Sequence, residues 1–392
     1  MTKAYDPLAS VQAAGPPGTI SFVYGLPDPV TFPADDLRLA FENTFKEKAS
    51  LALQYGPEQG YGPLIDYLRE KMGRGEGLKL ERPQITLTSG AAQGLDHICT
   101  MLTRPGDPVI VEAPTYHESL KTFRDHGLHA AQIPIDEEGL IVGRLLPILE
   151  KLKKRGKRIG FLYLIPSFQN PSGITLSLQR RKAILDVCQA FDLPVVEDDV
   201  YYDLIYEGKP LPSLFSLDKK GLVLRLGSFS KIMAPGLRLG WMLASPPFVD
   251  VFIQSGLRNM GGGANPLIAI ALDFYCRNGL LEPHIKSLQD HYRAKRDIML
   301  RSLEESMPGR VHWTKPSGGF FIWVELPPPL RAADLTAKAK EEKLMFFAGD
   351  AFFAESPAGQ YLRLAFSYVQ PEKIQEGIEK LSRLIKRELS SR

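Results

Sequence analysis

Between about residues 60 and 245, short apolar runs rich in β-branched side chains alternate with stretches of helical periodicity. Strands that are apolar on both faces are typical of a mostly parallel sheet covered by helices on each side. The sequence therefore predicts an α/β fold of this type. Open sheets bind ligands beyond the carboxyl ends of their strands, so functional residues are expected there. The predicted strands cover residues 84–88, 108–112, 159–165, 194–197 and 222–226, and the predicted helices cover residues 91–102, 117–126 and 178–191.

The rest of the chain predicts two further parts. Residues 1–35 are rich in Pro and Gly and predict an extended arm outside the core. The 392 residues are enough for two domains, and we expect a large domain over residues 36–272 and a smaller α+β domain, on which the arm packs, over residues 273–392. The elements expected there are a long helical segment over about residues 270–300, strands over 319–325 and 361–365, and helices over 332–341 and 371–389.

Charge and cysteine content argue against several classes of protein. Lys and Arg number 48 against 45 Asp and Glu, a net charge of +3 that gives no electrostatic case for nucleic acid. The three cysteines lie far apart and show no metal-like spacing, so neither a metal site nor a disulfide framework is expected. No signal-peptide core and no stretch of membrane-spanning length occurs. We therefore expect a cytoplasmic protein without a membrane partner.

The most informative motif is Gly227-Ser-Phe-Ser-Lys-Ile-Met-Ala-Pro-Gly-Leu-Arg-Leu-Gly240, directly after a predicted strand. It places Ser228, Ser230, Lys231 and Arg238 in one loop. A lysine that forms a Schiff base must be partly desolvated so that some of its amine is neutral. Hydroxyl groups and a guanidinium nearby suit a phosphate. The alternative is a solvated turn with a surface lysine.

This motif resembles the cofactor-lysine signature of class I/II aminotransferases in the fold-type I pyridoxal-phosphate-dependent family. The resemblance extends from about residue 21 to residue 369. It implies that Lys231 carries pyridoxal 5′-phosphate as a Schiff base and that the large domain binds this cofactor. Motifs at residues 21–27, 53–55, 164–173 and 196–199 are similar to the branch that holds bacterial α-aminoadipate aminotransferases and their kynurenine and aromatic relatives.

Three further motifs follow predicted strands. In Thr88-Ser-Gly-Ala-Ala-Gln93, small residues let helix amides approach an anion closely, and the resemblance places the phosphate on the amides of Ala91 and Ala92. The resemblance also implies that Tyr116 stacks on the pyridine ring. It implies that Asn170 donates to the cofactor's phenolic oxygen and lies at the substrate. A plain turn, a core tyrosine and an Asn-Pro turn are the respective alternatives.

Asp198 and Asp199 end an apolar strand, where an acid needs a cationic partner or hydrogen-bond donors. A protonated pyridine nitrogen is such a partner, and its protonation makes the cofactor an electron sink. The family pattern Asp-x-x-Tyr selects Asp198 with Tyr201, whose hydroxyl would bind the phenolic oxygen. Since successive strand residues face opposite ways, Asp199 is expected to point elsewhere as a capping acid.

Arg363 lies in the apolar run Tyr361-Leu-Arg-Leu-Ala365. A charge there is costly unless it is paired, and a guanidinium can bind a substrate α-carboxylate in bidentate fashion. The family has its carboxylate-binding arginine at this point, and a structural ion pair is the alternative. The resemblance also brings the backbone of Gly25 close to the substrate carboxylate, with a simple turn glycine as the alternative.

The resemblance implies a homodimer with shared active sites, because the family tyrosine at Tyr55 reaches the cofactor phosphate of the neighbouring subunit. Asn265 is a second candidate to cross that interface. Arg258 is expected to be a surface arginine, and binding of a distal substrate carboxylate from the partner subunit is the alternative.

The implied activity is transfer of an amino group from an L-amino acid to a 2-oxo acid by a ping-pong mechanism, with glutamate and 2-oxoglutarate as one couple. Lys231 would move the proton as base and then acid. One alternative is another reaction on the same cofactor, such as elimination or decarboxylation. A second is a ligand sensor fused to a winged helix, which would need a DNA-binding domain where only about twenty residues precede Ser21. The 15–18 run and Tyr24 depart from close relatives and leave the substrate side chain open.

Overall fold

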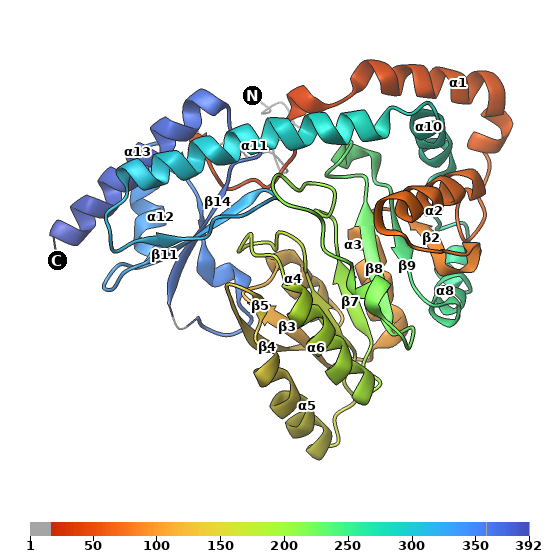
Figure 1. Cartoon of the computed structure of the whole chain (residues 1–392), viewed down its shortest axis with the longest axis horizontal. Helices are drawn as coiled ribbons and strands as arrows, with labels where there is room; N and C mark the ends of the chain where they lie inside the picture. The colour runs from red at the N-terminus through yellow and green to blue at the C-terminus, as the bar shows by residue number, and fades with distance from the viewer. Residues whose placement is uncertain (1–16, 358, 392) are drawn as a thin grey trace, which may run out of the picture.

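The fold was analysed in a computed structural model that describes residues 17–357 and 359–391. Its centre is an eight-stranded sheet with the order β2-β9-β8-β7-β6-β3-β4-β5 (Figure 1). Every pair from β8 to β4 is parallel, whereas β9 and β5 pair antiparallel to their neighbours. The predicted mostly parallel sheet is therefore confirmed. The strands are β2 (Ile85–Thr88), β3 (Pro108–Ala113), β4 (His129–Asp136), β5 (Gly139–Leu140), β6 (Leu162–Leu164), β7 (Val195–Asp198), β8 (Val223–Ser228) and β9 (Gly240–Leu243).

Helices cover both faces of this sheet, which explains why its strands are apolar throughout. In β3, Val109 and Val111 point into a core shared with α3, α4 and α8, whereas Ile110 points into a second core shared with α5 and α6. Each strand therefore contributes apolar side chains to two cores. The helices are α3 (Ala91–Leu102), α4 (His117–Asp125), α5 (Leu145–Lys154), α6 (Leu178–Ala190), α7 (Leu214–Leu217) and α8 (Pro246–Ile253).

A smaller antiparallel sheet, ordered β10-β11-β14-β13, forms the predicted α+β part. Helix α11 runs along one edge of the molecule and lies beside α13 at one end (Figure 1). The elements are β10 (His312–Trp313), β11 (Phe321–Leu326), β13 (Phe347–Ala348), β14 (Gln360–Ala365), α11 (Leu281–Ser306), α12 (Ala332–Glu341) and α13 (Pro371–Ser390). Within the described residues, no helix is both long and apolar enough to cross a membrane.

The predicted helical segment over 270–300 is two helices, α10 (Pro266–Arg277) and α11. Gly279 lies between them with a φ of 72°, a left-handed conformation that ends a helix. Two helices that were not predicted, α1 (Ala34–Ala52) and α2 (Gly62–Glu76), pack against α10. The predicted strand over 159–165 is shorter, since only the three residues of β6 pair with neighbours.

The described half of the N-terminal arm is extended, as predicted, but it belongs to the core. β1 (Ile20–Ser21) pairs in parallel with β12 (Leu344–Met345). Phe22 is fully buried, and its ring packs so closely on Gly377 of α13 that a Cβ there would lie 2.5 Å from Phe22 Cζ. The expectation that the arm stays outside the core is therefore wrong for this half. The first sixteen residues of the predicted arm lie outside the described part.

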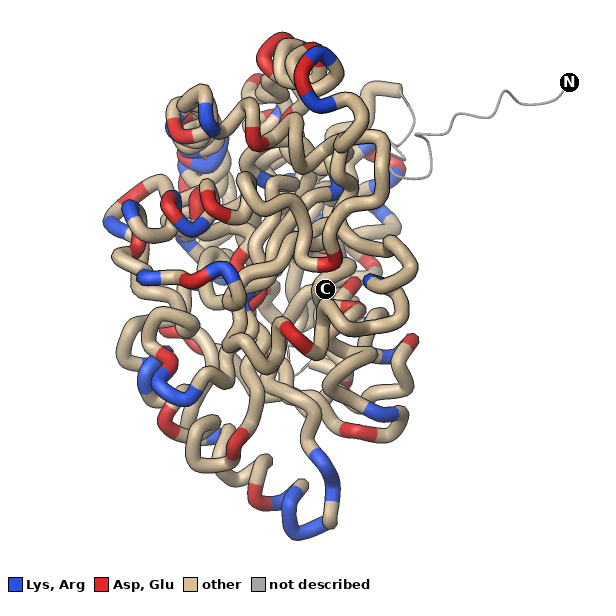
Figure 2. Tube along the Cα trace, turned by 90° about the vertical axis from the view of Figure 1, so that its right-hand side faces the viewer, with Lys and Arg blue, Asp and Glu red and all other residues tan. Residues whose placement is uncertain are grey.

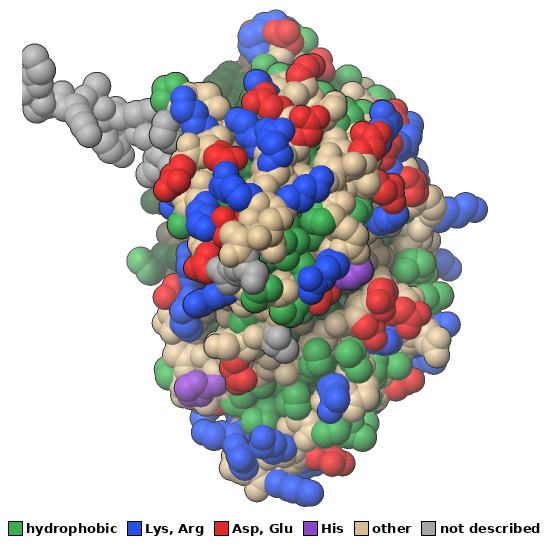
Figure 3. Space-filling view, turned by 90° about the vertical axis from the view of Figure 1, so that its left-hand side faces the viewer, with side chains coloured by type: hydrophobic (Ala, Val, Ile, Leu, Met, Phe, Trp, Pro, Cys, Tyr) green, Lys and Arg blue, Asp and Glu red, His purple; other side chains and the backbone are tan. Residues whose placement is uncertain are grey.

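The surface carries charges of both signs. Figure 2 shows Lys and Arg interspersed with Asp and Glu along one side of the chain, and Figure 3 shows the same mixture on the opposite side. Many of these charges form ion pairs, such as Arg38 with Glu42 and Lys286 with Asp290. The mixture agrees with a net charge of only +3.

Candidate active site

The carboxyl ends of five sheet strands meet at one cavity of about 260 Å³. β2, β3, β6, β7 and β8 each lead into a loop that contributes to its wall, so residues far apart in the sequence become neighbours. This is the edge of the sheet at which the sequence predicted functional residues. Predicted site residues that line the cavity are Ala91, Ala92, Tyr116, Asn170, Asp198, Tyr201, Ser228, Ser230, Lys231 and Arg238.

Lys231 follows β8 and points its amine into the site. Its Nζ donates a hydrogen bond to the carbonyl oxygen of Gly25, 3.0 Å away, and lies 5.8 Å from the ring centre of Tyr201. Burial, together with the positive charges of Arg363 and Arg238, lowers the pKa of Lys231 to about 8, against the opposing effect of Asp198. An appreciable fraction of the amine is therefore neutral near pH 8, which the solvated-turn alternative would not produce.

Asp198 is the last residue of β7. One of its carboxylate oxygens accepts a hydrogen bond and the other, here called the unbonded oxygen, accepts none from the described residues. Oδ2 accepts a hydrogen bond of 2.6 Å from Tyr163, whose hydroxyl in turn accepts one from Ser119. Oδ1 is buried and has no hydrogen-bond partner among the described residues. Burial and the neighbouring Asp199 raise the pKa of Asp198 to about 6. Because Asp198 lines the cavity, this unpartnered acceptor is available to a donor from a bound ligand.

Tyr163 is a site residue that sequence reasoning missed. It lies in β6 within an apolar run and is fully buried. The only signal in the sequence is a hydroxyl inside that run, because a buried Tyr hydroxyl needs a partner. Its hydroxyl donates to Oδ2 of Asp198 and leaves Oδ1 without a partner among the described residues.

The N-terminus of α3 and the loop after β8 form a cationic corner. Gly90 precedes α3 with a φ of 86° and provides no side-chain cap, so the first amides of the helix are free to bind an anion. A Cβ at Gly90 would lie 2.6 Å from Nη2 of Arg238, so only glycine leaves room for this guanidinium. Arg238 Nη1 donates to Ser230 Oγ at 3.4 Å. The corner combines amides, hydroxyl groups and a guanidinium, which suits a phosphate.

Arg363 lies in β14 with only 3% of its surface exposed. Nη1 donates to Asn170 Oδ1 at 3.0 Å, Nη2 donates to the carbonyl of Val23, and Nε has no hydrogen-bond partner in the described part of the chain. No carboxylate of the described residues pairs with it, so the predicted alternative of a structural ion pair is wrong. Burial lowers the pKa of Arg363 to about 10. A buried guanidinium with an unpartnered Nε and no acid beside it has the chemistry to bind an anion from outside the chain.

Asp199 points away from the cavity, as the strand alternation predicted, but it is not a capping acid. Its carboxylate binds Arg225, with Arg225 Nη2 2.8 Å from Oδ2, and the same guanidinium binds Glu76. The sequence indicated the direction of the side chain and missed its partners, because they lie on β8 and α2.

Three residues considered for the subunit interface lie in different surroundings. Tyr55 is 78% exposed, beside Gly261. Asn265 caps α10, where its Oδ1 accepts from the amide of Ile268. Arg258 is buried and donates to the backbone carbonyls of residues 58 and 87, so the surface-arginine expectation is wrong. These two carbonyls satisfy part of its guanidinium, whereas its Nε has no partner among the described residues.

Comparison with known proteins bears directly on this site. A family model described as "Aminotransferase class I and II" matches residues 29–381. This chain belongs to that family. The aminotransferase is 38% identical over 370 residues to aromatic-amino-acid aminotransferase 1 of Thermococcus litoralis, with 94% of this chain and 88% of the relative covered. It is 35% identical to the 2-aminoadipate transaminase of Thermus thermophilus, over 94% of this chain and 91% of that protein.

The solved structures give the same result. The crystal structure of Pyrococcus horikoshii kynurenine aminotransferase in complex with PMP superimposes with a TM-score of 0.92 at 38% identity, covering 99% of this chain and 96% of that one. The predicted family and fold are therefore confirmed, and the cofactor of this aminotransferase is pyridoxal 5′-phosphate.

The residues of the cavity fit this cofactor. The unbonded oxygen of Asp198 matches a protonated pyridine nitrogen, and the cationic corner at Arg238 matches a phosphate. Lys231 lies in the same cavity with a lowered pKa, as a covalent attachment point requires.

Capture of pyridoxal phosphate by the cofactor-free aminotransferase is expected to accelerate with rising pH and to level off above about pH 8. The neutral amine of Lys231 would be the nucleophile, and its pKa is lowered to about 8. Below that pH the protonated amine predominates and the rate falls about tenfold per pH unit. Stopped-flow absorbance measures this rate, and Nα-acetyl-lysine in the same buffers corrects for ionisation of the cofactor's own phenol and pyridine groups. A midpoint near pH 10, the ordinary range of lysine, would contradict the assignment.

Proposed function

We propose that Lys231, Asp198 and Tyr201 are the catalytic residues of this aminotransferase, with Lys231 holding the cofactor covalently. The observation that carries the proposal is the Lys231 amine, with a pKa of about 8, in one cavity with the unpartnered oxygen of Asp198. Residues proposed to bind the cofactor are Ala91, Ala92, Tyr116, Asn170, Asp198, Tyr201, Ser228, Ser230, Arg238 and, from the partner subunit, the Tyr55 position.

Each proposed role follows from the chemistry of the side chain. When bound, pyridoxal phosphate supplies an electron sink for the charge that develops at the substrate Cα. Lys231 would take the proton from the substrate Cα as a base and, as an acid, deliver it to the cofactor's C4′. Asp198 keeps a negative charge against the pyridine nitrogen. Burial holds the pKa of Tyr201 well above its ordinary value, so its hydroxyl stays a hydrogen-bond donor.

Substrate binding is assigned to Arg363, Asn170 and Gly25. The Arg363 guanidinium would bind the α-carboxylate, since it is buried without an acid. Asn170 holds that guanidinium through Oδ1. Gly25 faces the site through its carbonyl, and a Cβ there would overlap Phe321 Cζ at 2.3 Å, so a larger residue would displace the wall. The first 2-oxo acid leaves before the second substrate binds, which gives ping-pong kinetics.

Glutamate and 2-oxoglutarate are proposed as one substrate couple. Addition of L-glutamate without an acceptor is expected to bleach the visible band of the yellow holoenzyme into the near ultraviolet, and 2-oxoglutarate is expected to restore it. D-Glutamate is the matched control and should leave the band unchanged. A protein that bleaches with no L-amino acid would instead point to elimination or decarboxylation on the same cofactor.

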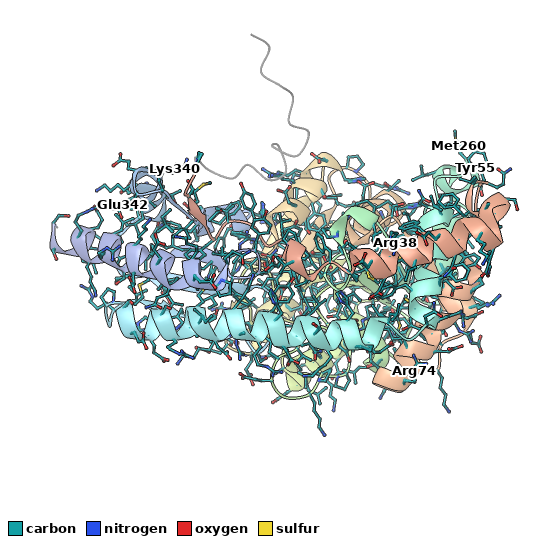
Figure 4. The ribbon with its side chains drawn as sticks, turned by 90° about the horizontal axis from the view of Figure 1, so that it is seen from above. Arg38, Tyr55, Arg74, Met260, Lys340 and Glu342 are labelled. Atoms are coloured by element: carbon teal, nitrogen blue, oxygen red, sulfur yellow. The ribbon has the colours of Figure 1, made fainter. Side chains whose placement is uncertain are left out.

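A homodimer is part of the proposal, and an exposed apolar face supports it. This Tyr55 face consists of Leu51, Leu53, Tyr55, Leu257 and Met260, all exposed. Figure 4 shows Tyr55 and Met260 next to each other at the outer edge of the molecule. Contiguous exposed apolar side chains mark association surfaces. A second copy on this face would cover it.

Replacement of Met260 by Glu is expected to shift the protein from dimer to monomer in light scattering. The 85% exposed side chain would become a charge within the proposed interface. The monomer should also lose cofactor on dilution, since it lacks the partner's Tyr55. Leu146→Glu, on the exposed side of α5, is the matched control. A Met260→Glu protein that stays dimeric would remove this face from the proposal.

We further propose that the protein works in the cytoplasm. The proposed domain boundaries are residue 35, after the arm, and residue 272, after the large domain. Cys99, Cys188 and Cys276 are buried free thiols. Burial raises the pKa of Cys99 and Cys188 to about 12, so these thiols stay protonated and unreactive. Unpaired thiols favour a reducing compartment.

A further inference from the structure

Residues 22–28, here called the strap, run between the two groups that are proposed to act on substrate. The carbonyl of Val23 accepts a hydrogen bond from Arg363 in the smaller sheet. The carbonyl of Gly25 accepts one of 3.0 Å from Lys231, after β8 of the large sheet. The strap therefore provides an acceptor to each proposed functional cation, and its position affects both.

The upstream end of the strap is fixed by strand pairing. The amide of Phe22 donates to the carbonyl of Met345, and the carbonyl of Phe22 accepts from the amide of Ala365. These bonds continue the pairing of β1 with β12 and attach the strap to β14, the strand that carries Arg363.

The downstream end is fixed by a buried ion pair. The Asp28 side chain has no exposed surface, and its Oδ2 accepts a hydrogen bond from Lys295 of α11, which is 1% exposed. Oδ2 also lies 3.1 Å from His291 Nε2, and the Asp28 amide donates to the Tyr292 hydroxyl at 2.9 Å. Three bonds from α11 thus converge on one strap residue.

The same lysine connects this ion pair to the loop after β14. Lys295 Nζ donates to the carbonyl of Ser367 at 2.9 Å, and Ser367 Oγ donates to the carbonyl of Leu26 at 2.7 Å. Leu26 directly follows Gly25. The connection therefore runs from α11 through Ser367 to the part of the strap that faces the cavity.

A buried ion pair contributes little net stability compared with apolar residues of the same volume. Its bonds are directional, however, and removal of one partner leaves an uncompensated charge. The guanidinium of Arg363 depends on the strap for one of its two acceptors, the other being Asn170. A small displacement of the strap would rotate the guanidinium away from the plane that a carboxylate needs.

We propose that Asp28 and Lys295 are positioning residues, whose ion pair holds the strap so that Arg363 is oriented for a substrate carboxylate. This inference rests on the proposed role of Arg363. It extends that role to Asp28 on the arm and Lys295 on α11, neither of which lines the cavity.

The test compares holoenzymes by calorimetric titration with glutarate, an unreactive dicarboxylate. Asp28→Asn is expected to raise the Kd of glutarate about tenfold, since the strap loses its anchor. The KM for L-glutamate should rise by about the same factor, while the single-turnover rate at saturation falls by less than about threefold. Cofactor content per subunit should match the wild type.

The matched control is Glu388→Gln, which removes the charge of another buried carboxylate. Glu388 lies on α13 and pairs with Lys338 on α12. It is expected to lower the unfolding temperature without changing the Kd of glutarate. If Asp28→Asn does not fold, the double variant Asp28→Leu with Lys295→Met removes both charges and should show the same rise in Kd.

An unchanged Kd in a folded Asp28 variant with full cofactor content would overturn the inference and leave the proposed function intact. A wild-type holoenzyme that neither binds glutarate nor bleaches with any L-amino acid would overturn both. An equal rise in Kd for Glu388→Gln would reduce the Asp28 effect to general destabilisation and would also overturn the inference.

Discussion

Replacement of Lys231 by glutamine is expected to lower the rate of amino transfer about ten-thousand-fold, the upper end of what a positioned acid–base group contributes. The substitution keeps a side chain of similar length at the end of β8 but removes the amine that carries the proton. The cationic corner at Arg238 and the unbonded oxygen of Asp198 remain, so the variant should still bind the cofactor without a covalent bond. Single-turnover absorbance with L-glutamate measures the rate.

Two controls distinguish loss of the amine from damage to the fold. Methylamine added to the truncated variant Lys231→Ala is expected to restore part of the rate, because a small neutral amine can enter the space that the missing side chain leaves in the cavity. Lys209→Gln removes an exposed lysine in the loop before α7 and should transfer amino groups at the wild-type rate. Wild-type turnover by Lys231→Gln would show that another base acts and would refute the assignment.

The part of the site that could be predicted from the sequence is the part built by local geometry. Ser228, Ser230, Lys231 and Arg238 lie within eleven positions of one another, so their spacing along the chain already brings them together. Asp198 was predictable because a carboxylate at the end of an apolar strand needs a partner, and the structure shows its unbonded oxygen.

The part that could not be predicted depends on contacts between distant segments. Asp28 lies 267 positions from Lys295, and a lysine within a mostly polar helix gives no sign that it is buried. The same holds for Arg258, whose backbone acceptors lie in the loop before α2 and in β2. No periodicity identifies such acceptors, because every residue has a carbonyl group.

The fold shows the same division. α3 and α12 have the predicted bounds, since each is one amphipathic helix between clear breaks. The break at Gly279 was missed because apolar residues continue on both sides of it, so one helix and two helices have similar patterns. The burial of Phe22 was missed because a Pro- and Gly-rich arm has no pattern from which its partner could be inferred.

Asp198 and Asp199 offer the sharpest test of the assigned roles, because neighbouring residues of the same type are expected to fail in opposite ways. Asp198→Asn should lower the transfer rate roughly a hundred- to thousandfold, as loss of one electrostatic group does in other active sites. It should not destabilise the cofactor-free protein. The pKa of Asp198 is raised to about 6, so above that pH its carboxylate disfavours the folded state, and asparagine removes this cost.

Asp199→Asn should leave transfer near the wild-type rate and lower the free energy of unfolding by about 3 kcal/mol, because it breaks a buried ion pair. Arg225 keeps Glu76 as a partner, which places the loss at the lower end of the range for such pairs. Urea unfolding of the cofactor-free proteins and single-turnover rates of the holoenzymes measure the two effects separately. The opposite result would be a slow transfer rate in Asp199→Asn and a lower free energy of unfolding in Asp198→Asn. It would mean that the pyridine nitrogen faces Asp199. The alternation of side chains along β7, on which the assignment of the site rests, would then have been assigned to the wrong face of the sheet.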